Sequence, residues 1–365
     1  MQKIEISYSL AGQRSNDALI RNPLMDLLHA VREQGSISAA AKALNYSYRH
    51  VWGELRRWEQ LLGRSLILWD KGQAARLSEF GDKLLWAERQ AQARLSAQIQ
   101  SLQADLERTL AVAFDDSAHV LTFYASHDDA LVALREHAQG LGSLHLDIRM
   151  TGSVDAIRAL NEGRCLMAGF HTQEQPLAGS LAQRCYKPLL KPGQHKIIGF
   201  ARRTQGLMVA RGNPLAMHTL ADLVRCQARF ANRALGSGTR VLLDELLAQQ
   251  QLSGAQLRGY ATSEPSHAAA AQAVASGQAD AALGIEAAAL ARGLDFVPLL
   301  QERYHLVCLK SALEQPAVLA LRKLLASSAW QQQLGRIAGY TPAQCGEVLS
   351  MRQLLPWWDF RKLKR

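Results

Sequence analysis

The chain has 365 residues, of which 48% are hydrophobic and 20% are charged, and its formal net charge is +10 at pH 7. This length allows two or three domains with sizeable cores, and the composition is that of a soluble globular protein. No run approaches the roughly 18 uninterrupted apolar residues of a membrane span, and the N-terminus lacks the apolar segment of a secretory signal. The five cysteines are scattered without metal-ligand spacing, which fits a reducing compartment. We therefore expect a cytoplasmic protein without a membrane segment or a metal site, and the basic charge favours nucleic acid or anionic ligands.

The first predicted elements belong to a small helical domain. Residues 3–9 alternate apolar and polar side chains, which predicts a strand at the edge of that domain. Asn22 followed by Pro23 is a favourable helix start, and the apolar residues after it recur at helical spacing as far as Val31.

Residues 36–62 predict two helices joined by a tight turn. Ser36 can cap a short, alanine-rich helix, and Ser47 can cap a second helix that ends at Gly63. A short, small-sided helix followed after a tight turn by a second helix is the layout of a helix-turn-helix. An amphipathic helical hairpin with a solvated basic face is the alternative interpretation.

The second of these helices carries polar and aromatic residues outside its apolar stripe. In a helix-turn-helix protein, the N-terminal part of this recognition helix meets base edges. Arg49 can bond guanine with two hydrogen bonds, and Ser47 and Tyr48 can reach phosphates. The residues predicted to bind DNA in the two helices are Ser36, Ser47, Tyr48, Arg49, Trp52 and Arg56.

After Gly63, the run 65–69, a turn at 70–72 and a return through residues 76–77 predict a two-stranded wing. Lys71 and Arg76 could contact backbone phosphate from this wing. A solvated hairpin without a role is the alternative.

Residues 27–95 resemble the N-terminal domain of the ModE family of molybdate-responsive repressors and, more distantly, LysR-type regulators. The resemblance rests on LLHAVREQGSISAAAKALNYSYRHVWGELRRWEQLLG and on LSEFGDKLL at the start of a long helix. It implies a winged helix-turn-helix that binds double-stranded DNA, with Ser47, Tyr48, Arg49 and Trp52 on the groove-facing helix.

Residues 78–110 predict one long helix whose apolar residues are spaced by roughly three, four or seven. Such a helix cannot bury its apolar stripe on a small domain, so we expect it to pair with its copy in a dimer. Dimers of this kind read two half-sites about one DNA turn apart. We therefore expect a homodimer or tetramer, with residues 114–117 as the linker.

From residue 119 onward, strands and helices alternate, which predicts an α/β domain. Apolar, β-rich runs at 119–125, 144–150 and 165–170 each lead into small polar residues and, in the first two cases, a helix. A second set of strands and helices begins at residue 206. Chain crossings near 200–206 and 296–303 would join the two sets into a two-lobed clamp with the ligand between the lobes.

The polar residues at the strand–helix junctions are the predicted ligand-binding residues. Ligands of open α/β sheets gather at the carboxyl ends of the strands, where free backbone N–H groups point at an anion. These residues are Ser126, His127, Thr151, Ser153, His171, Asn232, Arg233, Ser237, Thr239, Arg240, Ser266 and His267. The serines can instead be helix caps only, and each histidine alone can be structural.

The segment Gly236-Ser237-Gly238-Thr239-Arg240 supplies backbone donors, two hydroxyls and a guanidinium at a helix start, which suits an oxyanion or a carboxylate. A glycine-rich helix cap is the alternative. The segment lacks the Lys-Ser/Thr pair of a nucleotide-hydrolysing loop, and the adjacent Ser126-His127-Asp128 cannot form a catalytic relay on one turn. We therefore expect no enzyme activity.

Residues 205–302 resemble the periplasmic-binding-protein-like domain that occurs attached to helix-turn-helix domains or to molybdopterin-biosynthesis proteins. RRTQGLMVARGNP, NRALGSGTRVLLDELL and SHAAAAQAVASGQADAALGI carry the resemblance, which extends over most of residues 118–358. It implies a type 2 periplasmic-binding-protein-like fold and a link to molybdenum metabolism.

Together these patterns predict a mainly α winged helix-turn-helix at 1–77, a long dimerisation helix and linker at 78–117, and an α/β two-lobed ligand-sensing domain at 118–365. Lobe one would comprise about 118–203 and 300–365, and lobe two about 204–299. We expect a DNA-binding transcriptional regulator that senses a small anionic effector: molybdate or tungstate, a molybdenum-cofactor-related metabolite, or a small carboxylate. The alternative is a soluble carrier whose helix-turn-helix makes only protein contacts.

Overall fold

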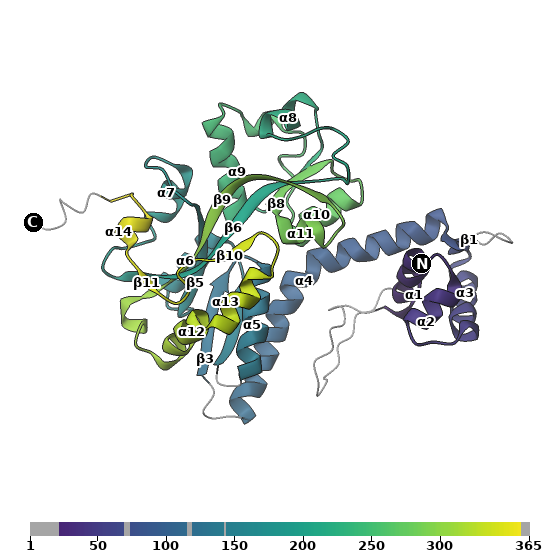
Figure 1. The fold of residues 1–365 in the computed structure, drawn as a ribbon, viewed down its shortest axis with the longest axis horizontal. Coiled ribbons are helices and arrows are strands. Elements are labelled where there is room, and N and C mark those ends of the chain that lie inside the picture. Colours follow the sequence, from purple (N-terminus) through teal and green to yellow (C-terminus); the bar gives the residue numbers. More distant parts are fainter. Residues whose placement is uncertain (1–21, 69–73, 115–118, 142–143, 359–365) are drawn as a thin grey trace, which may run out of the picture. The chain divides into compact units, whose positions relative to one another are not determined.

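The computed structural model describes residues 22–68, 74–114, 119–141 and 144–358 (Figure 1). The chain divides into two compact units, Met1–Ser96 and Ala97–Arg365. The predicted strand at 3–9, the tip of the wing with Lys71, and residues 115–117 of the predicted linker lie outside the described residues. Within the described part of the chain, no helix is both long and apolar enough to cross a membrane.

The described part of the first unit begins with three short helices: α1 (Pro23–Gln34), α2 (Ile37–Ala43) and α3 (Tyr48–Leu62). Each begins at a side-chain cap, as the sequence predicts. Asn22 accepts from the N–H of Leu24 at 3.0 Å, Ser36 from Ala39 at 3.0 Å and Ser47 from His50 at 3.1 Å. Gly63 ends α3 with φ 66°, a left-handed conformation that glycine adopts without steric cost.

The core of this unit confirms the predicted helix-turn-helix. Its members come from all three helices, the wing and the start of the next helix, and they include Leu28, Val31, Val51, Leu55, Leu66 and Leu85. Ala40 and Ala41 of α2 are also buried there, so the small side chains of this helix permit close packing.

The predicted wing is a pair of antiparallel strands, β1 (Ile67–Leu68) and β2 (Arg76–Leu77). Glu59 of α3 fixes its first strand, because the carboxylate accepts from the N–H of Leu66 at 2.8 Å. After the wing comes α4 (Glu79–Phe114), the predicted long helix. In this single chain Leu102 and Leu106 of α4 remain 59% and 43% exposed.

The second unit is built on a nine-stranded sheet of order β4-β3-β5-β9-β6-β8-β7, with β10 and β11 paired to β6. Its strands are β3 (His119–Ala125), β4 (Leu144–Met150), β5 (Met167–Gln173), β6 (His195–Val209), β7 (Phe230–Ala231), β8 (Ala281–Ile285), β9 (Asp295–Leu309), β10 (Tyr340–Pro342) and β11 (Val348–Leu349). The sheet is mixed: β3 pairs parallel with β4 and β5, whereas β6 and β9 are antiparallel.

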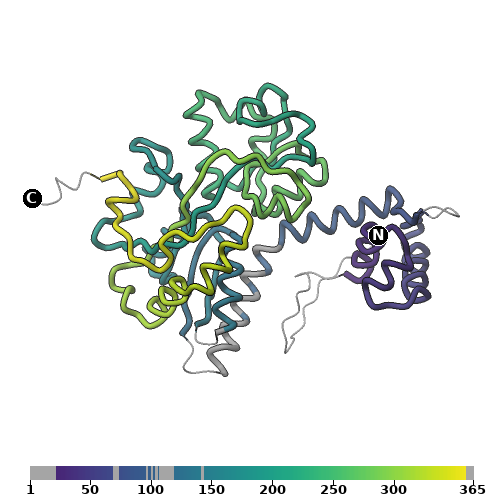
Figure 2. Tube along the Cα trace, in the orientation of Figure 1, coloured from purple at the N-terminus to yellow at the C-terminus, as the bar shows by residue number. Residues whose placement is uncertain are grey.

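Helices cover this sheet in both lobes (Figure 2). They are α5 (Asp129–Leu141), α6 (Ser153–Asn161), α7 (Leu181–Tyr186), α8 (Leu220–Arg225), α9 (Gly238–Gln249), α10 (His267–Ala275), α11 (Glu286–Leu290), α12 (Pro316–Ala326), α13 (Ser328–Gly335) and α14 (Met351–Leu354), with short 3₁₀ turns at Gly254–Gln256 and Lys310–Ala312.

The two long strands β6 and β9 make the two-lobed architecture. The first part of β6 pairs with β10 and β11, and its last five residues pair with β8. The last part of β9 pairs with β5, and both long strands pair with each other along most of their length. The predicted crossings at 200–206 and 296–303 therefore lie inside these strands, and the expected fold class is confirmed.

Candidate functional site

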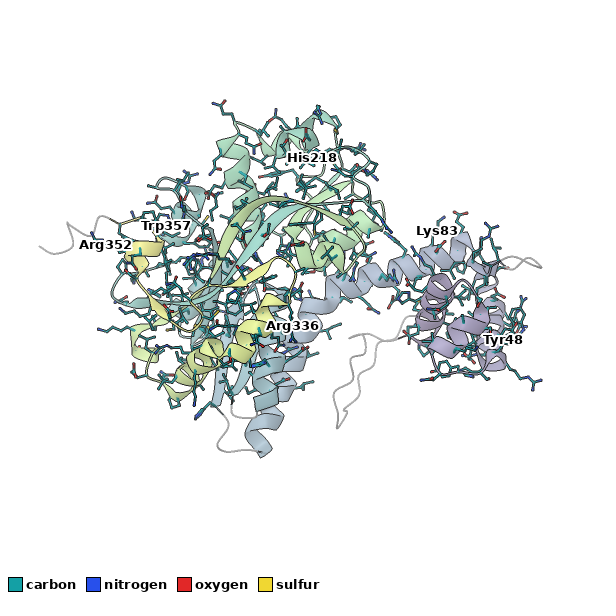
Figure 3. All side chains as sticks on the ribbon, viewed as in Figure 1. Tyr48, Lys83, His218, Arg336, Arg352 and Trp357 are labelled. Carbon is teal, nitrogen blue, oxygen red and sulfur yellow. The ribbon has the colours of Figure 1, made fainter. Side chains whose placement is uncertain are left out.

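The exposed face of α3 presents a row of aromatic and basic side chains. Tyr48, at the start of this helix (Figure 3), is 47% exposed, and its ring stacks on Trp52 with 6.3 Å between centroids and 9° between planes. The guanidinium of Arg56 lies 4.5 Å from the centre of the Trp52 ring and 3.0 Å from the Glu59 carboxylate. These contacts hold Arg56 in place, whereas Arg49 is exposed at the N-terminal end of the same helix.

Trp52 corrects one interpretation. The sequence places it outside the apolar stripe of α3, but the structure packs it partly against the core of the first unit. Its position directly after the buried Val51 lets one part of the large indole reach that core, while its ring stacks with Tyr48. The hydroxyls of Ser36 and Ser47 act as helix caps, and Arg76 is exposed on the wing.

In the second unit, three helices from both lobes begin at one place. Gly152, just before α6, lies so close to lobe two that a Cβ atom there would be 2.7 Å from the carbonyl oxygen of Gly236. A Cβ atom on Gly238, the first residue of α9, would be 3.1 Å from Nδ1 of His171 and 3.3 Å from Oγ of Ser153. A side chain at position 152 would clash with the backbone of Gly236, and one at position 238 would force His171 or Ser153 to shift, so glycine favours both approaches.

The start of α10 joins the same group. Nε2 of His267, the first residue of α10, lies 3.4 Å from Oγ1 of Thr239 in α9. The hydroxyls of Ser126 and Ser153 are 3.2 Å apart on the lobe-one side. Thus Ser126, Ser153, His171, Thr239 and His267, all residues at strand–helix junctions, lie together between the lobes.

Several buried polar atoms at this junction lack hydrogen-bond partners among the described residues. They are both ring nitrogens of His171, Nδ1 of His267, Nη1 of Arg233 and the hydroxyl of Tyr304. All four side chains are at most 4% exposed. A buried polar group without a partner costs free energy, about 1–3 kcal/mol and more when charged. Such a cluster is therefore typical of a site that a ligand completes.

The guanidinium of Arg233 is held from one side only. Its Nε and Nη2 donate to the carbonyl oxygens of Glu264 and Pro265, both at 3.2 Å, and Nη1 has no hydrogen-bond partner in the part of the chain that the structure describes. Burial, followed by the positive charge of Arg203, lowers the pKa of Arg233 to about 9. The group is charged at neutral pH, so it supplies a permanent cation to the junction.

The histidines of the junction are uncharged at neutral pH. Burial and then Arg233 lower the pKa of His127 to about 4. Burial holds the pKa values of His171 and His267 well below the ordinary range, and Arg203 and Arg233 act in the same direction on both. Arginine therefore supplies the positive charge of the junction, while the histidines stay neutral. The histidines can become protonated only if a negatively charged group lies beside them.

A buried ion network ties the lobe-crossing strands together at this point. Arg203 of β6 donates to the carboxylates of Glu302, opposite it on β9, and of Asp128, which follows β3. The hydroxyl of Tyr340 donates to Asp128 at 2.8 Å. The predicted set of ligand residues omits Arg203, Glu302, Tyr304 and Tyr340. Arg203 and Glu302 stand among other polar residues of β6 and β9, and only the pairing of these two strands brings them together in the buried network.

Arg240 is held by partners within lobe two. The sequence predicts that its guanidinium binds the anion, but Nε lies 3.2 Å from both carboxylate oxygens of Asp244, and the guanidinium stacks 3.9 Å from the centre of the Tyr260 ring. Successive side chains of a helix point in directions about 100° apart, and Arg240 of α9 points toward these lobe-two partners. Within the GSGTR segment, the backbone at Gly236 and Gly238 and the hydroxyl of Thr239 lie at the junction instead.

Other predicted residues have structural partners. The amide of Asn232 donates to the carbonyl oxygen of Tyr260 at 2.9 Å and accepts from the N–H of Arg233 at 2.9 Å. Ser237 and Ser266 cap α9 and α10, and the N–H of Thr151 donates to Ala125 at 2.7 Å. These residues shape the loops at the junction, and no group of acidic, histidine and cysteine side chains that could hold a metal ion occurs among the described residues.

A second contact fastens the lobes to each other. Glu245 of α9 accepts from the side-chain amide of Gln173, at the end of β5, at 3.0 Å, and from the N–H of Ala182 in α7 at 3.2 Å. Glu245 is buried, and this burial raises its pKa. Lobe two is thus bonded to two groups of the 118–203 segment beside the junction.

Comparison with known proteins gives two family matches. Residues 134–326, more than half of the chain, match the model for the PBP superfamily domain. Residues 24–82 match the model for bacterial regulatory helix-turn-helix proteins of the lysR family.

Two relatives are uncharacterised proteins. The chain is 33% identical over 198 residues to the Bacillus subtilis (strain 168) protein YvgK, a match that spans 54% of this chain and 63% of YvgK. It is 32% identical over 111 residues to a Clostridium pasteurianum protein encoded 5′ of a 2Fe-2S ferredoxin gene, which covers 30% of this chain and 98% of that protein.

Solved structures of similar proteins include LysG from Corynebacterium glutamicum with a bound effector Arg (17% identity, TM-score 0.40, 83% of this chain and 96% of that chain). They also include full-length CbnR in complex with its target DNA (18% identity, TM-score 0.38, 81% and 95%).

Proposed function

Because the chain belongs to the PBP superfamily and carries a lysR-family helix-turn-helix ahead of that domain, we propose that it is a DNA-binding transcriptional regulator whose two-lobed domain senses a small anion. The helix-turn-helix unit would read DNA with α3 and its wing. The two-lobed unit would close on the effector at the junction of α6, α9 and α10. A ligand that prefers one arrangement of the lobes would shift the population of the DNA-binding form.

One observation carries the DNA-binding part of the proposal: the basic and aromatic row of α3 stands exposed at the end of the helix that meets base edges in this motif. Arg56 is already bonded to Glu59 and stacked on Trp52, which suits a fixed contact with phosphate. Arg49 is exposed one residue after Tyr48 and can make the bidentate contact with guanine.

Selection from a random pool of double-stranded DNA with the full chain tests this proposal without knowledge of the operator. We expect the wild type to enrich one sequence motif. Arg49→Ala should then bind the enriched sequence more weakly by about 1–3 kcal/mol, since one bidentate base contact is lost. Arg158→Ala is the matched control, because Arg158 forms an exposed ion pair with Asp155 in the other unit. Enrichment of no sequence would favour the soluble carrier, and unchanged affinity in Arg49→Ala would remove α3 from the groove.

For the effector, the buried cationic junction supports an anion. Molybdate or tungstate, a molybdenum-cofactor-related metabolite and a small carboxylate remain the proposed candidates, and the link to molybdenum rests on sequence resemblance alone. We propose no enzymatic step. The predicted domain limits of 1–77, 78–117 and 118–365 also stay a proposal.

For the assembly, we propose a homodimer or tetramer in which α4 pairs with its copy. Leu102 and Leu106 lie four residues apart on this helix and are exposed in the single chain, so their side chains share a face that a second helix can cover. Leu102→Arg should convert dimers into monomers in sedimentation experiments. If the dimer survives this change, its interface lies elsewhere.

A further inference from the structure

The effector site inferred above contains a histidine with both of its ring nitrogens unused. His171 is 4% exposed, and neither Nδ1 nor Nε2 has a hydrogen-bond partner among the described residues. Its Nδ1 lies next to Gly238 at the start of α9, and Ser153 at the start of α6 is beside the same glycine. The imidazole thus stands where two helix N-termini, both favourable to negative charge, come together.

The donor count of this imidazole constrains the ligand. A neutral imidazole has one N–H donor and one acceptor nitrogen, whereas a protonated imidazole has two donors. A fully ionised oxyanion has only acceptor atoms. The N–H of a neutral imidazole can donate to it, but the other ring nitrogen, which is itself an acceptor, repels it. Protonation removes this mismatch, and Arg233, whose Nη1 has no partner in the described structure, adds a permanent positive charge.

We propose, on the basis of the function inferred above, that the effector is a dianion and that its binding is coupled to the uptake of a proton by His171. Arg233 balances one negative charge, and the protonated imidazole balances the second. The starts of α6 and α9 supply backbone N–H donors to the remaining oxygen atoms. A monoanion satisfies Arg233 alone and gives no reason for His171 to take up a proton.

The groups around His171 explain why the proton arrives only with the ligand. The ring of Tyr304 on β9 packs 3.9 Å from the His171 ring, and His305 is the next residue along that strand. Arg203 of β6 and Arg233, after β7, oppose a positive charge on His171. His267 of α10 is uncharged for the same reasons, and the coulombic effect between it and His171 lowers its pKa further.

The neighbouring carboxylates do not offset these cations at His171. Asp128 and Glu302 both accept from Arg203, and Glu264 acts on Arg233 rather than on His171. Together with burial, the cations keep the pKa of His171 well below its ordinary range in the ligand-free protein. An anion beside the ring raises this pKa, so the bound form holds a proton that the free form lacks, and binding becomes tighter as the pH falls.

Calorimetry of the full chain with sulfate and oxalate between pH 6 and pH 8 tests the proposal, because these probes stay dianionic over this range. Nitrate at equal ionic strength is the monoanion control. We expect at least one dianion to bind with an affinity that rises up to tenfold for each unit of decreasing pH. Titrations in two buffers of different ionisation enthalpy should show the uptake of up to one proton per bound dianion and none with nitrate.

Two variants and one control assign the effect. His171→Gln keeps one donor and one acceptor but cannot take up a proton, so its binding should be weaker and nearly independent of pH. Arg233→Gln should remove binding at every pH. His195→Gln should leave the pH dependence as it is, because buried His195 is bonded to Asn161 and Lys191 in lobe one, outside the junction.

The outcomes separate the inference from the proposed function. Dianion binding without proton uptake, or nitrate binding as tightly as the dianions, would overturn the inference and leave an anion sensor. Failure of every probe to bind the wild type would overturn both. The proton count needs only the wild-type chain, so a poorly folded His171→Gln variant does not affect that result.

Discussion

The recognition helix and the lobe junction use the same kinds of side chain in opposite surroundings. On α3, Tyr48 is 47% exposed, and Arg56 meets Trp52 and Glu59 at the surface. At the junction, Arg233 is 3% exposed, and one of its nitrogens has no partner among the described residues. The side chains on α3 stay hydrated in the absence of DNA, so this arrangement costs the folded protein little free energy. The second stores a desolvation cost that an anion can relieve.

This difference suits the partners proposed for the two units. DNA is a large polyanion that brings its own shape and counterions, so a solvated, partly fixed surface is enough to engage it. A small anion offers few contacts, and a buried site makes each of them stronger because the local dielectric is low. Substitution of a charged residue should therefore change the free energy of unfolding little on the exposed face of α3 and strongly at the buried junction.

The largest effect should come from the ion network that joins β6 to β9. Arg203→Ala leaves the buried carboxylates of Asp128 and Glu302 without their cation, and removal of one member of a buried pair costs about 3–5 kcal/mol. Arg56→Ala, which breaks the exposed pair with Glu59, should cost at most about 1 kcal/mol. Urea denaturation measures both changes, and hydrogen exchange assigns each transition to a unit. Equal losses would contradict the comparison.

Acid should destabilise the second unit through its buried histidines. Burial lowers the pKa of His127 to about 4 and that of His305 to about 3. The folded state therefore binds fewer protons than the unfolded state, whose histidines titrate near 6.5. This part of the stability is complete above pH 6.5 and is lost as the pH falls toward the folded pKa values.

At pH 5 the loss should be about 2 kcal/mol for each of these two histidines. Denaturation of the full chain at pH 7 and pH 5 measures it. His127→Gln should show a smaller difference between the two pH values than the wild type. An unchanged free energy of unfolding at pH 5 would mean that these histidines are not desolvated.

The smallest effect should come from the cap of the recognition helix. Ser47→Ala removes the hydrogen bond to the N–H of His50, which should cost the first unit about 1 kcal/mol. Ser47→Asn, another good cap, should restore most of that stability. Thermal unfolding of the three proteins measures the difference, and a loss in Ser47→Asn equal to that in Ser47→Ala would assign Ser47 a role other than capping.

Local signals in the sequence were sufficient for much of the fold. The caps Asn22, Ser36 and Ser47 and the stop at Gly63 fall where the sequence predicts them, because each depends on hydrogen bonds within three or four residues. The crossings inside β6 and β9 and the two-lobed fold class were also predictable from the order of strands and helices. The ligand residues stay a prediction, although several of them lie together at the junction of the lobes.

Only the tertiary structure determines which polar groups already have hydrogen-bond or ion-pair partners within the protein. The GSGTR pattern favoured Arg240, yet Asp244 and Tyr260 hold that guanidinium, whereas Nη1 of Arg233 at the junction has no hydrogen-bond partner among the described residues. Arg203 finds its two carboxylates 75 and 99 residues away along the chain. A sequence determines which donors exist and which helices they begin. Only the folded contacts between distant segments determine which donors are satisfied and which are left, desolvated, for a ligand.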